Sequence, residues 1–226
     1  FEKMILKISF LSQTFQSKTN QKSHLRYLVT LAFLAAILFV MDLTGIAMIP
    51  LPGQYASIMT VPVAVGAMML GPTAGGVLGG VMGMISFYTA LKTGFRDMNL
   101  MGYGGATVFL LTAFNSFVPR ILMGIATGWI FKLLKKVDKT NTLCYYVGGL
   151  VAPLLNTVLF MSVLIPIFMN APNLIGLLGE TLYAKFKEGI LLFALGYVGI
   201  QAVLEAVIGC ILSGSISKAL CKVVKR

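Results

Sequence analysis

Residues 60–83 read TVPVAVGAMMLGPTAGGVLGGVMG and contain no charged side chain. They lie inside a longer uncharged stretch that begins after Asp42 and ends before Lys92. A helix needs about 20 mainly apolar residues to cross a membrane, so this stretch is long enough for two crossings. Gly71-Pro72 divides it, because proline starts a helix well and cannot continue one. We therefore predict a short helix at about 56–70 and a glycine-rich helix at about 73–91.

Apolar runs on either side of this stretch add four more crossings. Their approximate ranges are 25–46, 106–134, 143–168 and 189–216. The sequence thus predicts an all-α fold, an integral membrane bundle of six transmembrane helices. We expect three parts: a polar cytoplasmic N-terminal extension (1–25), a six-helix transmembrane domain (26–218) and a basic cytoplasmic tail (219–226).

The composition indicates a protein that is solvated mainly by lipid. Of the 226 residues, 58% are hydrophobic and 11% are charged, whereas a soluble domain carries about 25% charged residues. This difference argues against a soluble globular enzyme. The formal net charge is +11, but the basic residues gather at the two ends and in one central connection. That distribution is typical of membrane proteins beside anionic lipid, and it argues against nucleic acid as a partner.

The same distribution predicts the orientation of the chain. Most of the 18 Lys and Arg residues lie in the two terminal segments and in the connection at 132–139. The connections on the other side carry few, namely Lys92, Arg96, Lys185 and Lys187. Because cytoplasmic loops hold the excess of Lys and Arg, we expect both termini to be cytoplasmic and the long connections to face outward.

Motifs for catalysis or metal binding are missing from the sequence. His24 is the only histidine, and Cys144, Cys210 and Cys221 have no CxxC spacing, so we expect no metal centre. No HExxH motif and no P-loop are present, so the chain has no nucleotide site of its own. We therefore predict that the protein is not an enzyme and binds no cofactor.

Polar side chains inside the spans are candidates for a binding site. Arg120 and Glu205 lie at similar depths, at about 1.5 Å of rise per residue, so we expect them to form an ion pair. That pair can be purely structural or can contact a ligand. Gln201 shares a helix face with Glu205, since the two are four residues apart. Asn115 and Asn156 need hydrogen-bond partners, from a neighbouring helix or from a ligand.

Small residues at four-residue spacing mark close helix contacts. In the first helix Ala32 and Ala36 have this spacing, with Ala35 beside them. They can pack inside the bundle or against another subunit. In the third and fourth helices the spacing recurs, and there we expect internal packing, at Gly75, Gly79, Gly83, Gly124 and Gly128.

Residues 60–83 resemble the substrate-binding S components of energy-coupling factor (ECF) vitamin transporters. Three further stretches share the resemblance: AFLAA at 32–36, FVPRILMG at 117–124, and Asn156-Thr157 followed by Glu205-Ala206. The likeness covers roughly residues 27–222, and within the family it is greatest to the pantothenate-type members.

The resemblance implies a six-helix protein of the bacterial plasma membrane that captures a vitamin from outside. It implies three partner subunits: a transmembrane scaffold (T) subunit, which Ala32 and Ala36 would contact, and two cytoplasmic ATPases, which would use the ATP. Pantothenate has a carboxylate, an amide and two hydroxyls, so its site would need a cation, for which Arg96, Arg120 and Lys185 are candidates. Hydrogen bonds would come from polar residues of the spans and outer connections, namely Tyr55, Tyr103, Asn115, Asn156 and Gln201. If Glu205 neutralises Arg120, Arg96 or Lys185 becomes the better partner for the anion.

Three alternatives stay open from the sequence. The substrate can be another vitamin, such as folate, riboflavin, a pyridoxine-like compound or a thiamine precursor. The chain can instead be a stand-alone ion-coupled transporter or channel, with Glu205 or Asp42 as the coupling site. It can also be an assembly subunit without a ligand.

Overall fold

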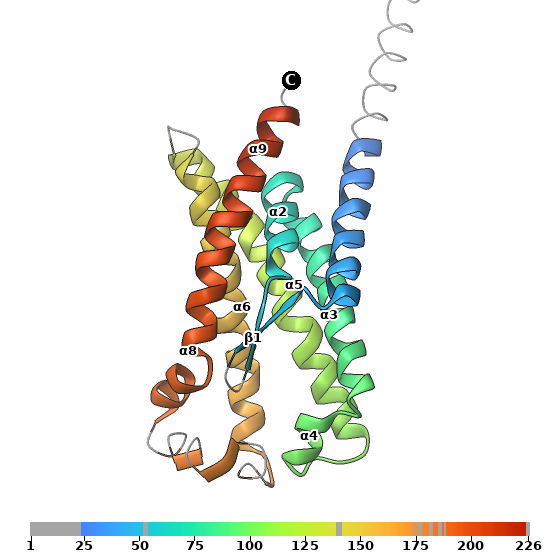
Figure 1. Ribbon diagram of the computed structural model, residues 1–226, viewed down its shortest axis with the longest axis vertical. Coiled ribbons are helices and arrows are strands. Elements are labelled where there is room, and N and C mark those ends of the chain that lie inside the picture. The colour runs from blue at the N-terminus through green and yellow to red at the C-terminus, as the bar shows by residue number, and fades with distance from the viewer. Residues whose placement is uncertain are drawn as a thin grey trace, which may run out of the picture.

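The structure is a bundle of long helices with a small hairpin against one half of it (Figure 1). This computed structural model describes residues 24–51, 54–138, 142–173, 175, 178–180, 183–184, 187 and 189–224. An N-terminal helix, His24–Thr44, precedes the remaining elements. These are β1 (Met48–Leu51), β2 (Gln54–Ser57), α2 (Thr60–Leu70), α3 (Pro72–Lys92), α4 (Arg96–Leu100), α5 (Ala106–Val137), α6 (Leu143–Met169), α8 (Ile190–Ile208), the π-helix η1 (Gly209–Ser213) and α9 (Gly214–Val224).

Five helices of the described chain are long and apolar enough to cross a membrane. They are His24–Thr44, Pro72–Lys92, Ala106–Val137, Leu143–Met169 and Gly199–Cys221. The remaining apolar helix, α2, has only 11 residues. The expectation of a multi-pass helical membrane protein is therefore confirmed, and α2 is the short element that the sequence indicated.

The break between α2 and α3 falls where the sequence placed it. Gly71 has a φ of +101°, a conformation that side chains other than glycine rarely adopt. Pro72 follows as the first residue of α3, where its missing N–H leaves no helical hydrogen bond unmade. The chain therefore reverses within a single residue, and α2 and α3 pack against each other.

The hairpin β1–β2 is an addition to the helical fold that the sequence did not predict. The two strands pair antiparallel, with Met48 opposite Ser57 and Leu51 opposite Gln54. Figure 1 shows that they slant across the bundle from the N-terminal helix toward α8, and β2 contacts α8. The hydrogen bonds between β1 and β2 satisfy backbone N–H and C=O groups that have no water to bond inside the membrane. The connection between the N-terminal helix and α2 can therefore enter the bundle.

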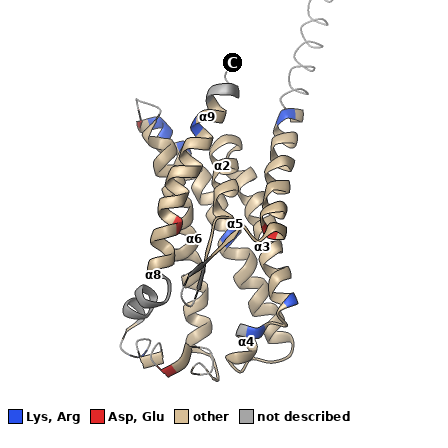
Figure 2. Ribbon diagram, viewed as in Figure 1, with Lys and Arg blue, Asp and Glu red and all other residues tan. Residues whose placement is uncertain are grey.

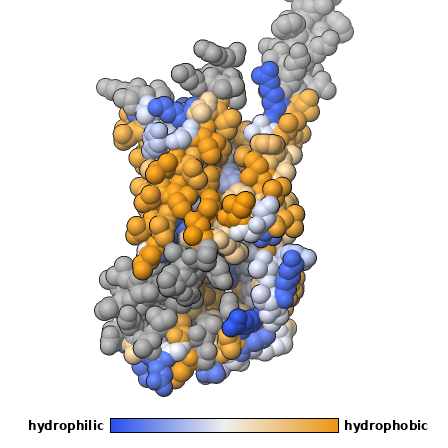
Figure 3. Space-filling view, in the orientation of Figure 1, coloured by the Kyte–Doolittle hydropathy of each residue, from blue (hydrophilic) through white to orange (hydrophobic). Residues whose placement is uncertain are grey.

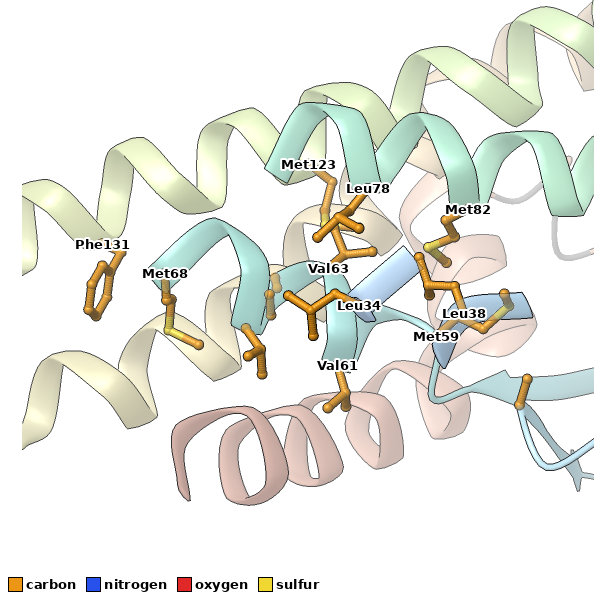
Figure 4. Packing of buried hydrophobic residues seen from close by; sticks show 14 of the residues in the cluster. Leu34, Leu38, Met59, Val61, Val63, Met68, Leu78, Met82, Met123 and Phe131 are labelled. Carbon is orange, nitrogen blue, oxygen red and sulfur yellow. The ribbon is translucent and has the colours of Figure 1, made fainter. Parts of the chain in front are cut away.

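Helix α2 lies at the centre of the main hydrophobic core. Its residues from Thr60 to Met68 are buried, and Figure 4 shows the side chains around it. The N-terminal helix contributes Leu34 and Leu38 to this core. Because these two side chains point inward, the opposite face of that helix is left outside the bundle.

Glycines bring α3 and α5 into backbone contact, as the sequence predicted. A Cβ atom added at Gly75 would overlap with the carbonyl of Gly124, and one at Gly124 with the carbonyl of Gly75. At Gly83, a Cβ would lie 2.9 Å from the carbonyl oxygen of Ser116. Lipid tails are as apolar as the side chains, so the hydrophobic effect does not drive helices together within the membrane. Close van der Waals packing of this kind stabilises the contact between α3 and α5 instead.

We expect Gly124→Ala to destabilise the protein by about 1–3 kcal/mol, because the new methyl group must push α3 away from α5. Gly80→Ala is the matched control, since its Cβ would lie 3.8 Å from its nearest neighbour, Ile121 Cγ1. Thermal unfolding of the purified proteins in detergent measures the difference as a lower Tm for Gly124→Ala alone. Equal Tm values for the two variants would contradict the close contact.

Charged residues lie mainly toward the two ends of the bundle (Figure 2). Hydrophobic side chains dominate the middle of the face seen in Figure 3. The first and last described segments, at His24 and Val224, lie at the same end of the bundle in Figure 1. The surface is therefore that of a protein surrounded by hydrocarbon at its middle and by polar groups at its ends.

Candidate functional site

Arg120 compensates for a proline in its own helix. Pro119 lies inside α5, and because it has no N–H, the carbonyl of Asn115 four residues earlier loses its helical partner. Arg120 Nη1 donates to this carbonyl at 3.1 Å and to the carbonyl of Ser116 at 3.0 Å. The guanidinium therefore satisfies a backbone group that would otherwise be left unpaired inside the membrane.

The other edge of the Arg120 guanidinium remains available. Its Nε is buried and has no hydrogen-bond partner among the described residues. The guanidinium lies 5.9 Å from the ring centroid of Phe160, on α6. The arrangement thus provides a cation whose Nη1 is committed to the backbone and whose Nε is not.

Glu205 is held by donors from two elements. Its Oε1 accepts a hydrogen bond of 2.7 Å from the backbone N–H of Ser57 in β2 and one of 2.9 Å from Gln201 Nε2. Only 3% of Glu205 is exposed, so these donors supply hydrogen bonds that water cannot. The Ser57 donor lies 148 positions away in the sequence.

The prediction of an ion pair between Arg120 and Glu205 is wrong. Within the described part of the chain the two residues form no ion pair, although they are near enough to interact electrostatically. The physical reason is competition from the backbone. Arg120 donates to the backbone carbonyls of Asn115 and Ser116, and Glu205 accepts from the backbone N–H of Ser57.

Four residues predicted from the sequence therefore lie in one neighbourhood, which we call the polar cluster: Asn115, Arg120, Gln201 and Glu205. Three buried atoms of this cluster have no hydrogen-bond partner in the described structure, namely Asn115 Oδ1, Arg120 Nε and Gln201 Oε1. Native proteins leave few buried polar atoms unpaired, and such atoms require an explanation. Two acceptors and a cationic donor together match a ligand that has both an anionic group and donor groups.

Asn156 lies on the same side of α6 as the polar cluster. It is four residues before Phe160, so the two share a helix face, and Phe160 is the residue that lies beside Arg120. The Asn156 side chain is partly buried. Its amide can therefore extend the polar cluster from α6.

Two described candidates in the outer connections, Arg96 and Tyr103, do not join the polar cluster. Arg96 is exposed at the start of α4. Tyr103 donates its hydroxyl to the carbonyl of Ile167 at 2.8 Å and thereby ties this connection to α6; burial raises the pKa of that hydroxyl. Lys185 and the side chain of Tyr55 lie outside the described residues.

A hollow lies at the end of α6 and was not predicted. It has a volume of about 260 Å³ and includes Phe168, Asn173, Tyr183 and Lys187 among its lining residues. The ammonium of Lys187 lies 4.9 Å from the ring centroid of Tyr183. The sequence analysis named Lys185 of the same connection, not Lys187, as a candidate cation for the substrate.

The small residues of the N-terminal helix point away from the bundle. Ala32 and Ala36 are exposed and Ala35 is partly buried. Leu34 and Leu38, by contrast, are 6% and 0% exposed. Internal packing, one of the two roles considered above, therefore does not explain Ala32 or Ala36.

Taken together, the fold and the site define a multi-pass membrane protein that keeps unpaired polar groups inside an apolar bundle. Residues 26–217 match the family model described as the substrate-specific component of ECF transporters, and the chain belongs to this family. It is 30% identical over 217 residues to the pantothenate transporter PanT of Leuconostoc mesenteroides subsp. mesenteroides, with 92% of this chain and 97% of the relative covered. The family and this relative are transporters, not enzymes, and the chain is a multi-pass protein of a bacterial cell membrane.

Proposed function

We propose that the chain is an S component that captures pantothenate on the outer side of the membrane and delivers it inward. The observation that carries the proposal is the polar cluster with its unpaired atoms on Asn115, Arg120 and Gln201. The match to a pantothenate transporter over almost the whole chain supports the choice of vitamin.

The chemistry of pantothenate fits this set of groups. Its carboxylate would bind the edge of Arg120 formed by Nε and Nη2, because a guanidinium edge can hold a carboxylate through two parallel hydrogen bonds. Its hydroxyls and amide N–H would donate to Asn115 Oδ1 and Gln201 Oε1. Asn156 would bind at the α6 side, and Phe160 would pack against the apolar part of the molecule.

Delivery requires partners, since the sequence contains no nucleotide motif. We propose a transmembrane T subunit and two cytoplasmic ATPases, which use the ATP, with Ala32 and Ala36 as the contact to the T subunit. Six crossings, with α2 and the hairpin together forming the second, would leave both termini cytoplasmic. The basic residues Arg26, Lys132, Lys135, Lys136 and Lys218 support this orientation.

Titration of the purified protein with a panel of vitamins tests the substrate. We expect pantothenate to give saturable heat in calorimetry and to raise the Tm, because a ligand that binds only the folded state stabilises it. Folate, riboflavin, pyridoxine and a thiamine precursor serve as the comparison ligands. A clear shift with one of these and none with pantothenate would contradict the assignment.

Reconstitution tests the mode of transport. Liposomes that contain only this chain should not accumulate pantothenate under a proton or sodium gradient, whereas liposomes with the T subunit and both ATPases should do so when ATP is present. Gradient-driven uptake by the chain alone would instead establish an ion-coupled transporter.

A further inference from the structure

The hairpin places backbone groups at membrane depth, where each must find a partner. Ser57 is the last residue of β2, and the carboxylate that accepts its N–H belongs to Glu205, inside the span Gly199–Cys221. An unpaired N–H at this depth would cost several kcal/mol. The hydrogen bond to Glu205 is therefore what allows the end of β2 to lie against α8.

The other side of the hairpin is fixed to the N-terminal helix. The N–H of Ile58 donates to the carbonyl of Ala47 at 2.9 Å, and the N–H of Ala47 donates to the carbonyl of Met41 at 3.2 Å. The hairpin thus connects the N-terminal helix to α8, as Figure 1 shows. Glu205 provides the described hydrogen bond at the α8 end of this connection.

Glu205 also determines the orientation of the Gln201 amide. Glu205 Oε1 accepts hydrogen bonds from both Ser57 and Gln201, so the group that Gln201 turns toward it is the NH2 group. This orientation leaves Gln201 Oε1 as the buried atom without a partner. Gln201 can therefore offer a ligand the acceptor Oε1, while one of the two Nε2 hydrogens is already used by Glu205.

From these contacts we propose that Glu205 is a positioning residue and not a ligand of the substrate. It fastens the hairpin to α8 and turns the acceptor of Gln201 toward the substrate. The part that concerns substrate rests on the proposed function, whereas the hydrogen bond to the hairpin does not. The side chain acts through its acceptor oxygen, so a neutral acceptor should replace it in part.

Hydrogen exchange of the full-length protein, in detergent and without substrate, tests the hairpin directly. In Glu205→Ala we expect the backbone amides of the peptide that covers residues 54–59 to exchange about 10-fold faster or more, since the buried acceptor of the Ser57 N–H is lost. In Glu205→Gln the amide oxygen still accepts from Ser57, so exchange should stay closer to the wild-type rate. Unchanged exchange in Glu205→Ala would overturn the proposal.

A matched pair of variants at Ser57 separates the backbone from the side chain. Ser57→Pro removes the N–H donor, whereas Ser57→Ala keeps it and removes only the hydroxyl that accepts from the N–H of Met59 at 3.3 Å. We expect faster exchange of the neighbouring hairpin amides in Ser57→Pro only. If Ser57→Pro exchanges at the rate of Ser57→Ala, the Glu205 bond does not hold the hairpin and the proposal fails.

Pantothenate binding then tests the role toward substrate. We expect Glu205→Ala to release pantothenate about 10-fold faster or more, with Glu205→Gln between it and the wild type. If Glu205→Gln loses binding as completely as Glu205→Ala while its hairpin stays protected, Glu205 is itself a ligand and the proposal is overturned. If the wild-type protein does not bind pantothenate, the proposed function fails, and the exchange experiments still decide the role of Glu205 in the hairpin.

Discussion

Arg120→Ala is expected to lower pantothenate affinity about 100-fold or more, because it removes the one cation of the polar cluster. A buried carboxylate without a cationic partner would have to leave water without compensation. Isothermal titration calorimetry measures the loss. Arg120→Lys should recover only part of the affinity, since a single ammonium cannot bond the Asn115 carbonyl and hold both carboxylate oxygens in a fixed plane.

The structural role of Arg120 complicates this experiment and also supplies its control. Arg120 satisfies the carbonyl that Pro119 leaves free, so Arg120→Ala also exposes an unpaired backbone group. In Pro119→Ala the N–H of residue 119 is restored and can bond the carbonyl of Asn115 in the ordinary helical way. The double variant Pro119→Ala/Arg120→Gln therefore removes the cation without leaving that carbonyl unpaired.

This double variant separates the two roles of Arg120. If Arg120 binds the carboxylate, the double variant should fold with a Tm near that of Pro119→Ala and still fail to bind pantothenate. Binding close to that of Pro119→Ala would mean that Arg120 serves only the helix, and the site would then need another cation, such as Arg96 or Lys185.

The spans could be predicted from the sequence because hydrocarbon imposes a simple requirement of length and apolarity. The uncharged stretch around Gly71-Pro72 predicted the end of α2 and both ends of α3 closely, since a proline after a glycine fixes the break. The start of α2 was predicted too early, because residues 54–57 form β2. The hairpin could not be predicted in the same way. Its strands have four residues each and lack a clear alternation of polar and apolar side chains, which is the pattern that identifies a strand.

Four of the residues predicted for the site lie near one another in the structure, but the hydrogen bonds that they make were not predicted. Depth along the helices brought Arg120 and Glu205 together, and four-residue spacing added Gln201. The expected ion pair does not form because each side chain bonds the backbone instead. Arg120 donates to the carbonyl that Pro119 leaves without a helical partner, and Glu205 accepts from the N–H of Ser57. The N–H of Ser57 lies 148 positions from Glu205 in the sequence. Only the tertiary structure brings the two together, so the pattern of side chains could not predict this hydrogen bond.

Ala32→Leu and Ala36→Leu are expected to leave pantothenate binding intact and to prevent assembly with the T subunit. Both alanines are exposed and are surrounded on this face by larger exposed side chains, such as Phe33 and Val40. Because their side chains are smaller than these neighbours, we expect the two alanines to leave a shallow notch where another helix can approach closely. Filling such a contact costs about 1–3 kcal/mol, so we expect roughly 10-fold or more loss of T subunit in copurification.

Two controls show that the effect comes from the shape of the notch. Ala36→Ser keeps a small side chain, so complex formation and ATP-dependent uptake should persist. Val40→Leu adds bulk outside the notch and should also assemble, because its neighbourhood already holds large side chains. If Ala32→Leu and Ala36→Leu lose pantothenate binding and Tm together, the alanines support the fold of this chain. If both variants assemble normally, the T subunit binds a different face.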